Sequence, residues 1–123
     1  MNGKGKIMVV EDNEDIRFSV RLILETSGFT VTTASNGQEA LDLLREGDMP
    51  RLILLDMLMP IMDGWHFAAE FHSLYGHQIP IVVMTAATDA VQRAKDVEAE
   101  SYVSKPFTIE LLLENVERNI KAA

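Results

Sequence analysis

The stretch RLILLDMLMPIMDG, residues 51–64, decides the fold that this sequence predicts. It contains four consecutive apolar residues at positions 52–55, without the polar alternation of a half-exposed strand. Such a run is typical of a central strand in a parallel sheet, which is covered on both faces. The run ends at Asp56, and Pro60 and Asp63-Gly64 then mark a loop before the next helical pattern. Asp56 is therefore expected at the carboxyl end of a buried strand, where open α/β sheets bind ligands.

The rest of the chain repeats this alternation of strand and helix. Further short apolar or β-branched runs predict strands at residues 7–10, 29–34, 79–84 and 102–104. A helical pattern follows each strand, and side chains that can cap these helices stand at Asn13, Asn36, Thr88 or Asp89, and Thr108. Five strands alternating with five helices predict a parallel sheet with helices on both faces. No linker or repeat interrupts the pattern, so residues 1–123 are expected to form a single domain.

Composition and charge exclude several classes of function. The chain has 11 basic and 19 acidic residues, a net charge of −8, which opposes direct DNA binding because phosphate backbones require a basic surface. The absence of cysteine excludes disulfides, thiolate metal sites and cysteine nucleophiles. The first apolar run is too short for a signal peptide or a membrane span. We therefore expect a cytoplasmic protein that is not anchored to a membrane.

Polar side chains stand at the ends of four of the predicted strands. Glu11 and Asp12 follow the first strand, Asp56 ends the third, and Thr85 and Lys105 follow the fourth and fifth. Because parallel strands end at one edge of a sheet, these side chains are expected to converge. Neighbouring carboxylates repel one another, and Mg²⁺ relieves that repulsion. A metal beside a nucleophilic carboxylate, with a hydroxyl and an ammonium to receive phosphoryl oxygens, predicts phosphoryl transfer.

Short signatures at these strand ends give the chain a family resemblance. They are Glu11-Asp12, Asp56 with Met59-Pro60 and Met62-Asp63-Gly64, Thr85-Ala86, and Lys105-Pro106-Phe107. Together they resemble the receiver domain of two-component response regulators, in the family's order and over nearly the whole chain. The resemblance implies a flavodoxin-like, doubly wound (βα)5 fold with its five-stranded parallel sheet in the order 2-1-3-4-5.

The resemblance implies a chemical role for the residues around Asp56. This aspartate would accept a phosphoryl group from a sensor histidine kinase, from a phosphotransfer protein of a phosphorelay, or from a small donor such as acetyl phosphate. Asp12, Asp56 and the backbone carbonyl of Leu58 would ligate Mg²⁺, with Glu11 nearby or acting through water. The domain would phosphorylate and dephosphorylate itself as a signalling phosphoprotein, and it would not be a turnover enzyme.

The resemblance also implies a switch that responds to the phosphoryl group. Thr85 would hydrogen-bond this group and Lys105 would pair with it, and the bond between Lys105 and Pro106 is expected to be cis. Tyr102, three positions before the lysine, occupies the family's switch position. When Thr85 is drawn to the phosphoryl group, the tyrosine ring can turn inward and redistribute two conformations of the surface formed by the fourth helix, the fifth strand and the last helix. A downstream protein would read this surface, and the chain would be a monomer or a weak phosphorylation-dependent dimer.

Two departures from the family pattern carry expectations of their own. The positions that usually tune hydrolysis, two residues after the acceptor and two after the threonine, hold Leu58 and Ala87. Neither side chain can orient a water molecule, so spontaneous dephosphorylation is expected to be slow. Residues 97–100, VEAE, replace the Gly-Ala turn that is common before the fifth strand, which affects the length of the fourth helix.

Other interpretations fit these residues less well. A dehalogenase-type phosphatase needs a second acid two residues after its nucleophile, where this chain has Leu58, and a degenerate receiver scaffold is disfavoured because every phosphorylation residue is present. For Tyr102, a plain strand residue is the alternative to the switch role. His66, His72 and His77 are spaced by six and five residues and do not stack on one helical face, which favours solvated histidines over a metal site.

Overall fold

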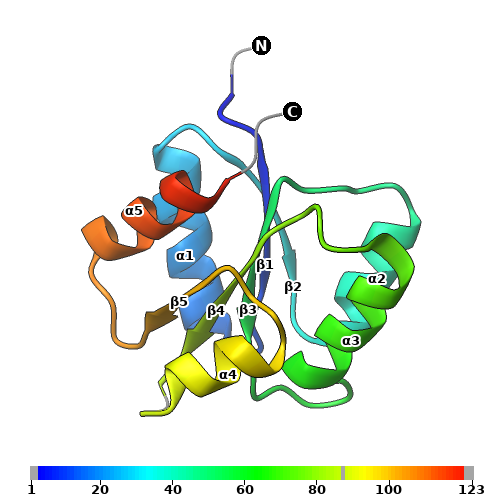
Figure 1. Ribbon diagram of the computed structural model, residues 1–123. Coiled ribbons are helices and arrows are strands. Elements are labelled where there is room, and N and C mark those ends of the chain that lie inside the picture. Colours follow the sequence, from blue (N-terminus) through cyan, green and yellow to red (C-terminus); the bar gives the residue numbers. More distant parts are fainter. Residues whose placement is uncertain (1–2, 87, 121–123) are drawn as a thin grey trace.

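The structure is a computed structural model that describes residues 3–86 and 88–120. Its strands form one parallel sheet in the order β2-β1-β3-β4-β5, which confirms the predicted order (Figure 1). The strands are β1 (Lys6–Val10), β2 (Thr30–Ala34), β3 (Leu52–Asp56), β4 (Ile81–Thr85) and β5 (Ser101–Ser104). The helices are α1 (Glu14–Thr26), α2 (Gly37–Arg45), α3 (Gly64–Tyr75), α4 (Ala90–Asp96) and α5 (Ile109–Asn119). Among the described residues, no helix is long and apolar enough to cross a membrane.

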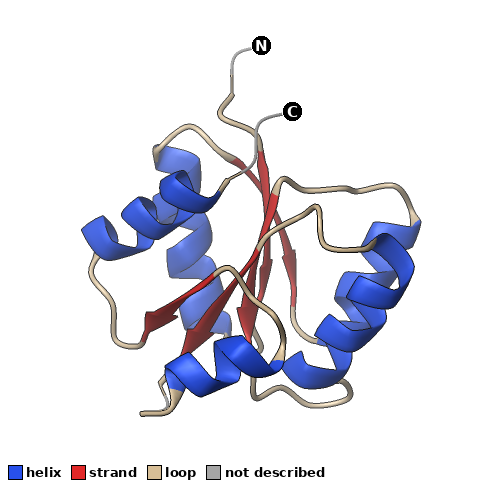
Figure 2. Cartoon of the chain, viewed as in Figure 1, coloured by secondary structure: helices blue, strands red, loops and turns tan. Residues whose placement is uncertain are grey.

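The sheet lies between two layers of helices, α1 and α5 on one face and α2, α3 and α4 on the other (Figure 2). Every residue of β3 and β4 is buried, as the unbroken apolar run of residues 52–55 predicts. On α3, Phe67 and Phe71 are fully buried, with ring centroids 5.8 Å apart. Two continuous cores therefore hold the strands rigidly, so their carboxyl ends provide a fixed edge for polar side chains.

Local capping explains where four of the helices begin, with Asp63 as the cap of α3. The side chains of Asn13, Asn36 and Thr108 accept hydrogen bonds from backbone N–H groups at 2.9, 2.9 and 3.1 Å, as predicted. The sequence prediction is wrong at α4, where Asp89 makes no capping hydrogen bond and its carboxylate lies 3.2 Å from Arg93 Nε. The apolar periodicity of the last helix places Ile109 on one face with Leu112 and Val116, but Ile109 is 54% exposed.

The loop between α4 and β5 has an unusual backbone. Glu98 has a φ of 55°, in the left-handed region that costs a residue with a side chain about 1 kcal/mol or more. The next turn is tied to β4, because Glu100 N donates to Ile81 O at 2.8 Å and Ile81 N donates to Glu100 Oε1 at 3.0 Å. The segment VEAE, which stands in place of the Gly-Ala turn, therefore follows a helix of only seven residues. Its Glu98 has a left-handed backbone conformation.

Candidate functional site

The register of the sheet aligns the strand ends that carry the predicted site. Val10 pairs with Leu55, and Asp56 with Met84, so β1, β3 and β4 end at one level. The residues beyond these ends line a single hollow. Its lining consists of Glu11, Asp12, Asn13, Ile16, Asp56, Leu58, Thr85, Ala86, Arg93 and Lys105. The structure thus brings together the strand-end acids, the hydroxyl and the ammonium that the sequence placed on separate elements.

A lysine lies between two of the buried acids of this hollow. Lys105 Nζ is 2.7 Å from Glu11 Oε1 and 3.4 Å from Asp56 Oδ1. Glu11 is 1% exposed and Asp56 is 7% exposed, so their charges are largely removed from water. Because transfer of an ionised carboxylate out of water is costly, the ammonium group is essential to the charge balance of this edge.

The carboxylates of the hollow have the arrangement of a hard-cation site. One oxygen from each of Glu11, Asp12 and Asp56 lies within 4.8 Å of the others. Mg²⁺ takes oxygen ligands at about 2.0–2.1 Å and keeps several waters, so a few carboxylates on one side of the ion suffice. The oxygen-only donor set therefore fits Mg²⁺.

The environment of the hollow shifts the pKa of Asp56. Burial, and after it the nearby charge of Glu11, raises the pKa of Asp56 to about 7, although Lys105 acts in the opposite direction. Without a cation, the folded state therefore holds a proton on Asp56 that the unfolded chain has released above about pH 4. Ionisation of this carboxyl is therefore less favourable in the folded state than in the unfolded chain.

This proton has a measurable effect on stability. Between about pH 4 and pH 7 the native state binds more protons at Asp56 than the unfolded state, so the free energy of unfolding falls as the pH rises. In a buffer with EDTA, Asp56→Asn should flatten this dependence and raise the melting temperature at pH 8 by roughly 5 °C. Calorimetry at pH 5 and pH 8 measures both effects, with the exposed Asp15→Asn as control. Equal pH profiles for Asp56→Asn and the unsubstituted protein would contradict this prediction.

Arg93 is a residue of the hollow that sequence reasoning missed. Its Nη1 donates to Thr85 Oγ1 at 3.1 Å, and its guanidinium group lies 5.3 Å from the centroid of the Trp65 ring. With Asp89 four residues before it, Arg93 forms an i,i+4 pair along α4. The spacing of Asp89 and Arg93 was the only signal in the sequence that involves this arginine. It does not show that the arginine side chain points toward β4. The hollow therefore contains a second cation, attached to the helix that follows the threonine.

Other predicted positions differ in how they relate to this hollow. Leu58 lines it and is 62% exposed, while Ala87 lies outside the described residues. The bond between Lys105 and Pro106 is cis, which places the lysine where the chain turns from β5 toward α5. Tyr102 on β5 is 39% exposed, so its ring is directed toward the surface and not into the hollow.

Two of the three histidines lie closer together than their spacing along the sequence indicates. His66 Nδ1 lies 2.8 Å from Asp63 Oδ1 on the exposed first turn of α3, as a solvated polar residue can. The rings of His72 and His77, however, stack with their centroids 3.9 Å apart. Helical spacing does not apply to this pair, because α3 ends at Tyr75 and Gly76, with a φ of 75°, turns the chain back.

Comparisons with known proteins agree with this geometry. The family model described as the response regulator receiver domain matches residues 7–117. The response regulator MprA of Mycolicibacterium vanbaalenii is 38% identical over 110 residues, which are 88% of this chain and 47% of that protein. The chain thus spans about half the length of the curated relatives that it matches.

Solved structures show the same relationship in three dimensions. The chemotaxis response regulator CheY4 of Vibrio cholerae has a TM-score of 0.83 and 32% identity, covering 92% of this chain and 96% of that one. The receiver domain of a signal transduction histidine kinase from Syntrophus aciditrophicus has a TM-score of 0.83 and 29% identity, covering 97% and 98%. From its sequence, its sheet order and these relatives, the chain belongs to the family of response regulator receiver domains, which are signalling domains of two-component systems.

Proposed function

We propose that this chain is a phosphorylation-operated switch in which Asp56 is the phosphoryl acceptor. The observation that carries the proposal is the position of Asp56 in one hollow with Glu11, Asp12 and Lys105. The carboxylates of Asp12 and Asp56 and the backbone carbonyl of Leu58 would hold Mg²⁺, with Glu11 nearby or acting through water. When bound, the metal would neutralise charge on the phosphoryl oxygens and favour the ionised form of Asp56.

Each residue of the hollow then has a separate role in phosphoryl transfer. A carboxylate oxygen of Asp56 attacks the phosphorus of a phosphohistidine or of an acyl phosphate, a P–O bond to the aspartate forms, and the bond to the donor breaks with its electrons leaving on the donor. Lys105, which is 3.4 Å from Asp56, pairs with a phosphoryl oxygen. Thr85 directs its hydroxyl group to another phosphoryl oxygen. Catalysis here is mostly positioning and charge neutralisation.

Arg93 supplies a link from the hollow to α4. In the structure, Arg93 Nη1 donates to Thr85 Oγ1. When Thr85 turns toward a phosphoryl group it leaves this contact, so the arginine and the helix that carries it are released to a second arrangement. Tyr102 then turns into the space that Thr85 has vacated. A few kcal/mol of differential stabilisation is enough to exchange the populations of two such arrangements.

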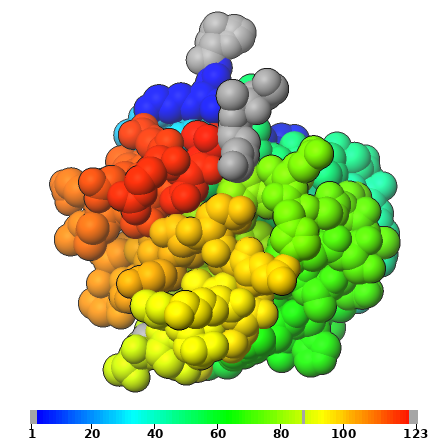
Figure 3. Space-filling model, viewed as in Figure 1, coloured from blue at the N-terminus to red at the C-terminus, as the bar shows by residue number. Residues whose placement is uncertain are grey.

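A downstream protein would read the surface that this switch changes. Large apolar side chains are exposed on α4, β5 and α5, at Val91, Tyr102, Ile109 and Leu111. Figure 3 shows this face, with α4 in yellow below the orange and red surface of β5 and α5. A change in α4 would alter how these side chains are presented together.

The family implies a histidine kinase as the upstream partner. We propose that residues 1–123 act as one receiver domain in the cytoplasm, as a monomer or a weak phosphorylation-dependent dimer. The comparisons do not confirm the predicted absence of direct DNA binding, since the chain covers only 47% of MprA. For this chain that absence stays a prediction from its net charge of −8.

Incubation with acetyl phosphate and Mg²⁺, followed by intact-mass measurement, tests the function. We expect one phosphoryl adduct per chain, which is absent in Asp56→Asn and retained in Asp63→Asn, a change at the nearby α3 cap. Continuous hydrolysis of many phosphate esters without a stable adduct would instead support a dehalogenase-type phosphatase. No adduct in the unsubstituted protein would support a binding scaffold.

The lifetime of this adduct should depend on position 58. Leu58 is exposed at the mouth of the hollow and offers no hydrogen bond to an attacking water. Leu58→Asn or Leu58→Glu is expected to shorten the lifetime roughly tenfold, because a polar side chain can orient that water. The adduct is followed by intact mass after the donor is removed, with Leu58→Met as the apolar control. If the asparagine, glutamate and methionine variants all decay at the original rate, the leucine does not govern hydrolysis.

A further inference from the structure

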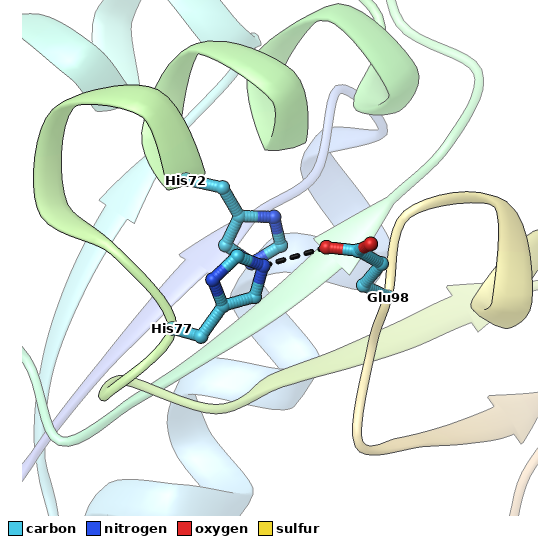
Figure 4. A group of neighbouring side chains, drawn as sticks. All are labelled: His72, His77 and Glu98. Carbon is cyan, nitrogen blue, oxygen red and sulfur yellow. Dashed lines mark hydrogen bonds and ion pairs between the residues drawn. The ribbon is translucent and has the colours of Figure 1, made fainter.

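A second group of metal-ligating side chains lies far from the phosphorylation residues in the fold. His72 is in the last turn of α3, His77 is in the loop before β4, and Glu98 is in the loop before β5 (Figure 4). Both loops lead into the amino ends of strands. Asp56 and its neighbours lie at the carboxyl ends of the strands. The two groups therefore occupy opposite edges of the same sheet.

The three side chains converge closely. His77 Nε2 lies 2.6 Å from Glu98 Oε1, and the His72 and His77 rings stack at 3.9 Å with an angle of 14° between their planes. One ligand atom from each residue lies within 4.8 Å of the other two. Within residues 3–86 and 88–120, this trio and the acids of the hollow are the two groups with such spacing.

We propose that His72, His77 and Glu98 bind a transition-metal ion, with Zn²⁺ as the best match. Zn²⁺ binds imidazole nitrogen at about 2.0–2.1 Å and carboxylate oxygen at about 2.0–2.2 Å, so neighbouring ligand atoms of a tetrahedral site lie roughly 3.4 Å apart. The side chains of His77 and Glu98 are 56% and 67% exposed, so both are free to rotate to this separation. Water takes the fourth position.

The chemistry of the trio separates it from the acidic hollow. Two imidazoles and one carboxylate suit Zn²⁺, Ni²⁺ or Cu²⁺, whereas Mg²⁺ prefers sites made of oxygen atoms. Glu11, Asp12 and Asp56 offer only oxygens. The two edges of the sheet are therefore expected to select different ions, and millimolar Mg²⁺ should not compete for the trio.

The backbone holds the trio in place from both sides. Gly76 has a φ of 75° and turns the chain so that His77 returns to the end of α3. Glu98 has a φ of 55°, an unfavourable conformation for a residue with a side chain, and such outliers gather at functional sites. The His77–Glu98 pair has 56% and 67% exposed side chains, and an exposed pair contributes too little to explain this arrangement.

Metal binding at the trio would act on α4. Glu98 follows the end of this helix at Asp96 by two residues, while Arg93 of the same helix contacts Thr85 at the other edge of the sheet. An ion shared by Glu98 and the end of α3 would fix the loop that closes α4. This binding does not depend on phosphorylation of Asp56, so the two proposals fail separately.

Calorimetric titration of the EDTA-treated and dialysed protein with ZnCl₂, in a buffer with millimolar Mg²⁺, tests the site. We expect one Zn²⁺ per chain and a rise in melting temperature with zinc concentration. His72→Ala, His77→Ala and Glu98→Gln should each raise the dissociation constant by about tenfold or more. His66→Ala, which removes an exposed histidine of the same helix, and Asp56→Asn should leave it unchanged. Circular dichroism of each variant verifies that it folds.

Three results would overturn the proposal. The first is the absence of saturable binding in the unsubstituted protein. The second is an unchanged dissociation constant in all three ligand variants, which would mark the binding as adventitious. The third is loss of zinc binding in Asp56→Asn together with competition by Mg²⁺, which would place the ion in the acidic hollow.

Discussion

Lys105→Met is expected to lower the free energy of unfolding by about 3–5 kcal/mol at pH 8 in the absence of divalent cations. The lysine side chain is 15% exposed and lies between the carboxylates of Glu11 and Asp56. Methionine has a similar length and no charge, so the substitution leaves two buried acids without their cation. Breaking a buried ion pair by removing one partner costs this much because the remaining charge stays desolvated.

The same variant should recover part of its stability as the pH falls. The pKa of Asp56 is already raised to about 7 by burial, and loss of the ammonium group raises it further. At pH 5.5 the aspartate of the variant is protonated, which removes one of the two unpaired charges. The deficit relative to the unsubstituted protein therefore shrinks between pH 8 and pH 5.5.

Urea denaturation at these two pH values measures both effects. Lys4→Met is the matched control, because Lys4 pairs with Glu117 at the surface, where both side chains are about half exposed. Its expected cost is below about 1 kcal/mol, with little dependence on pH. A loss in Lys105→Met no greater than that of Lys4→Met would show that the buried acids do not depend on this lysine.

Gly64→Ala is expected to destabilise the protein by about 3 kcal/mol, although it adds a single methyl group to the start of a helix. A Cβ at this position would lie 2.7 Å from Met57 Sδ, 2.8 Å from Met57 Cα and 2.9 Å from Asp56 O. Two of these three atoms belong to the backbone at the end of β3 and directly after it, so a side-chain rotation cannot remove the clash. The loop of residues 57–63 or the start of α3 must move.

This movement also affects the proposed metal ligands. The backbone N–H of Gly64 donates to Met57 O at 2.9 Å. The residue after Met57 is Leu58, whose carbonyl is a proposed Mg²⁺ ligand. Gly64→Ala is therefore expected to weaken Mg²⁺ binding as well as folding. Urea denaturation gives the stability, and the shift of the melting temperature with added Mg²⁺ gives the binding.

Gly3→Ala is the control for this substitution. A Cβ at residue 3 would have its nearest neighbour at 3.4 Å, and this glycine is exposed, so a change within about 0.5 kcal/mol is expected. If Gly64→Ala unfolded at the same urea concentration as Gly3→Ala, with unaltered Mg²⁺ response, the close packing of this loop on α3 would have no energetic consequence.

The elements were predictable because their signals are local. The cap of α1 at Asn13 and the buried run of β3 each depend on a few consecutive residues, and both are confirmed. Some observed strand boundaries differ by one or two residues from the predicted ones, for local chemical reasons. The fourth strand begins at Ile81 and not at residue 79, because Pro80 has no N–H to donate to the sheet. Ile109 shows the limit of periodicity, since it shares the apolar stripe of α5 with the buried Leu112 and Val116 but is itself exposed.

The sequence by itself determined the alternation of strands and helices and the placement of acids, a hydroxyl and an amine at the strand ends. Parallel topology then obliges those residues to share one edge, whatever the details of packing. Only the tertiary structure decided that Arg93 reaches Thr85 and that His72, His77 and Glu98 meet. These contacts depend on where short loops turn and on which way single side chains point. The periodicity of the sequence contains no information on either. Topology is set by patterns that extend over many residues, whereas such contacts are set by a few dihedral angles in loops such as those at Gly76 and Glu98.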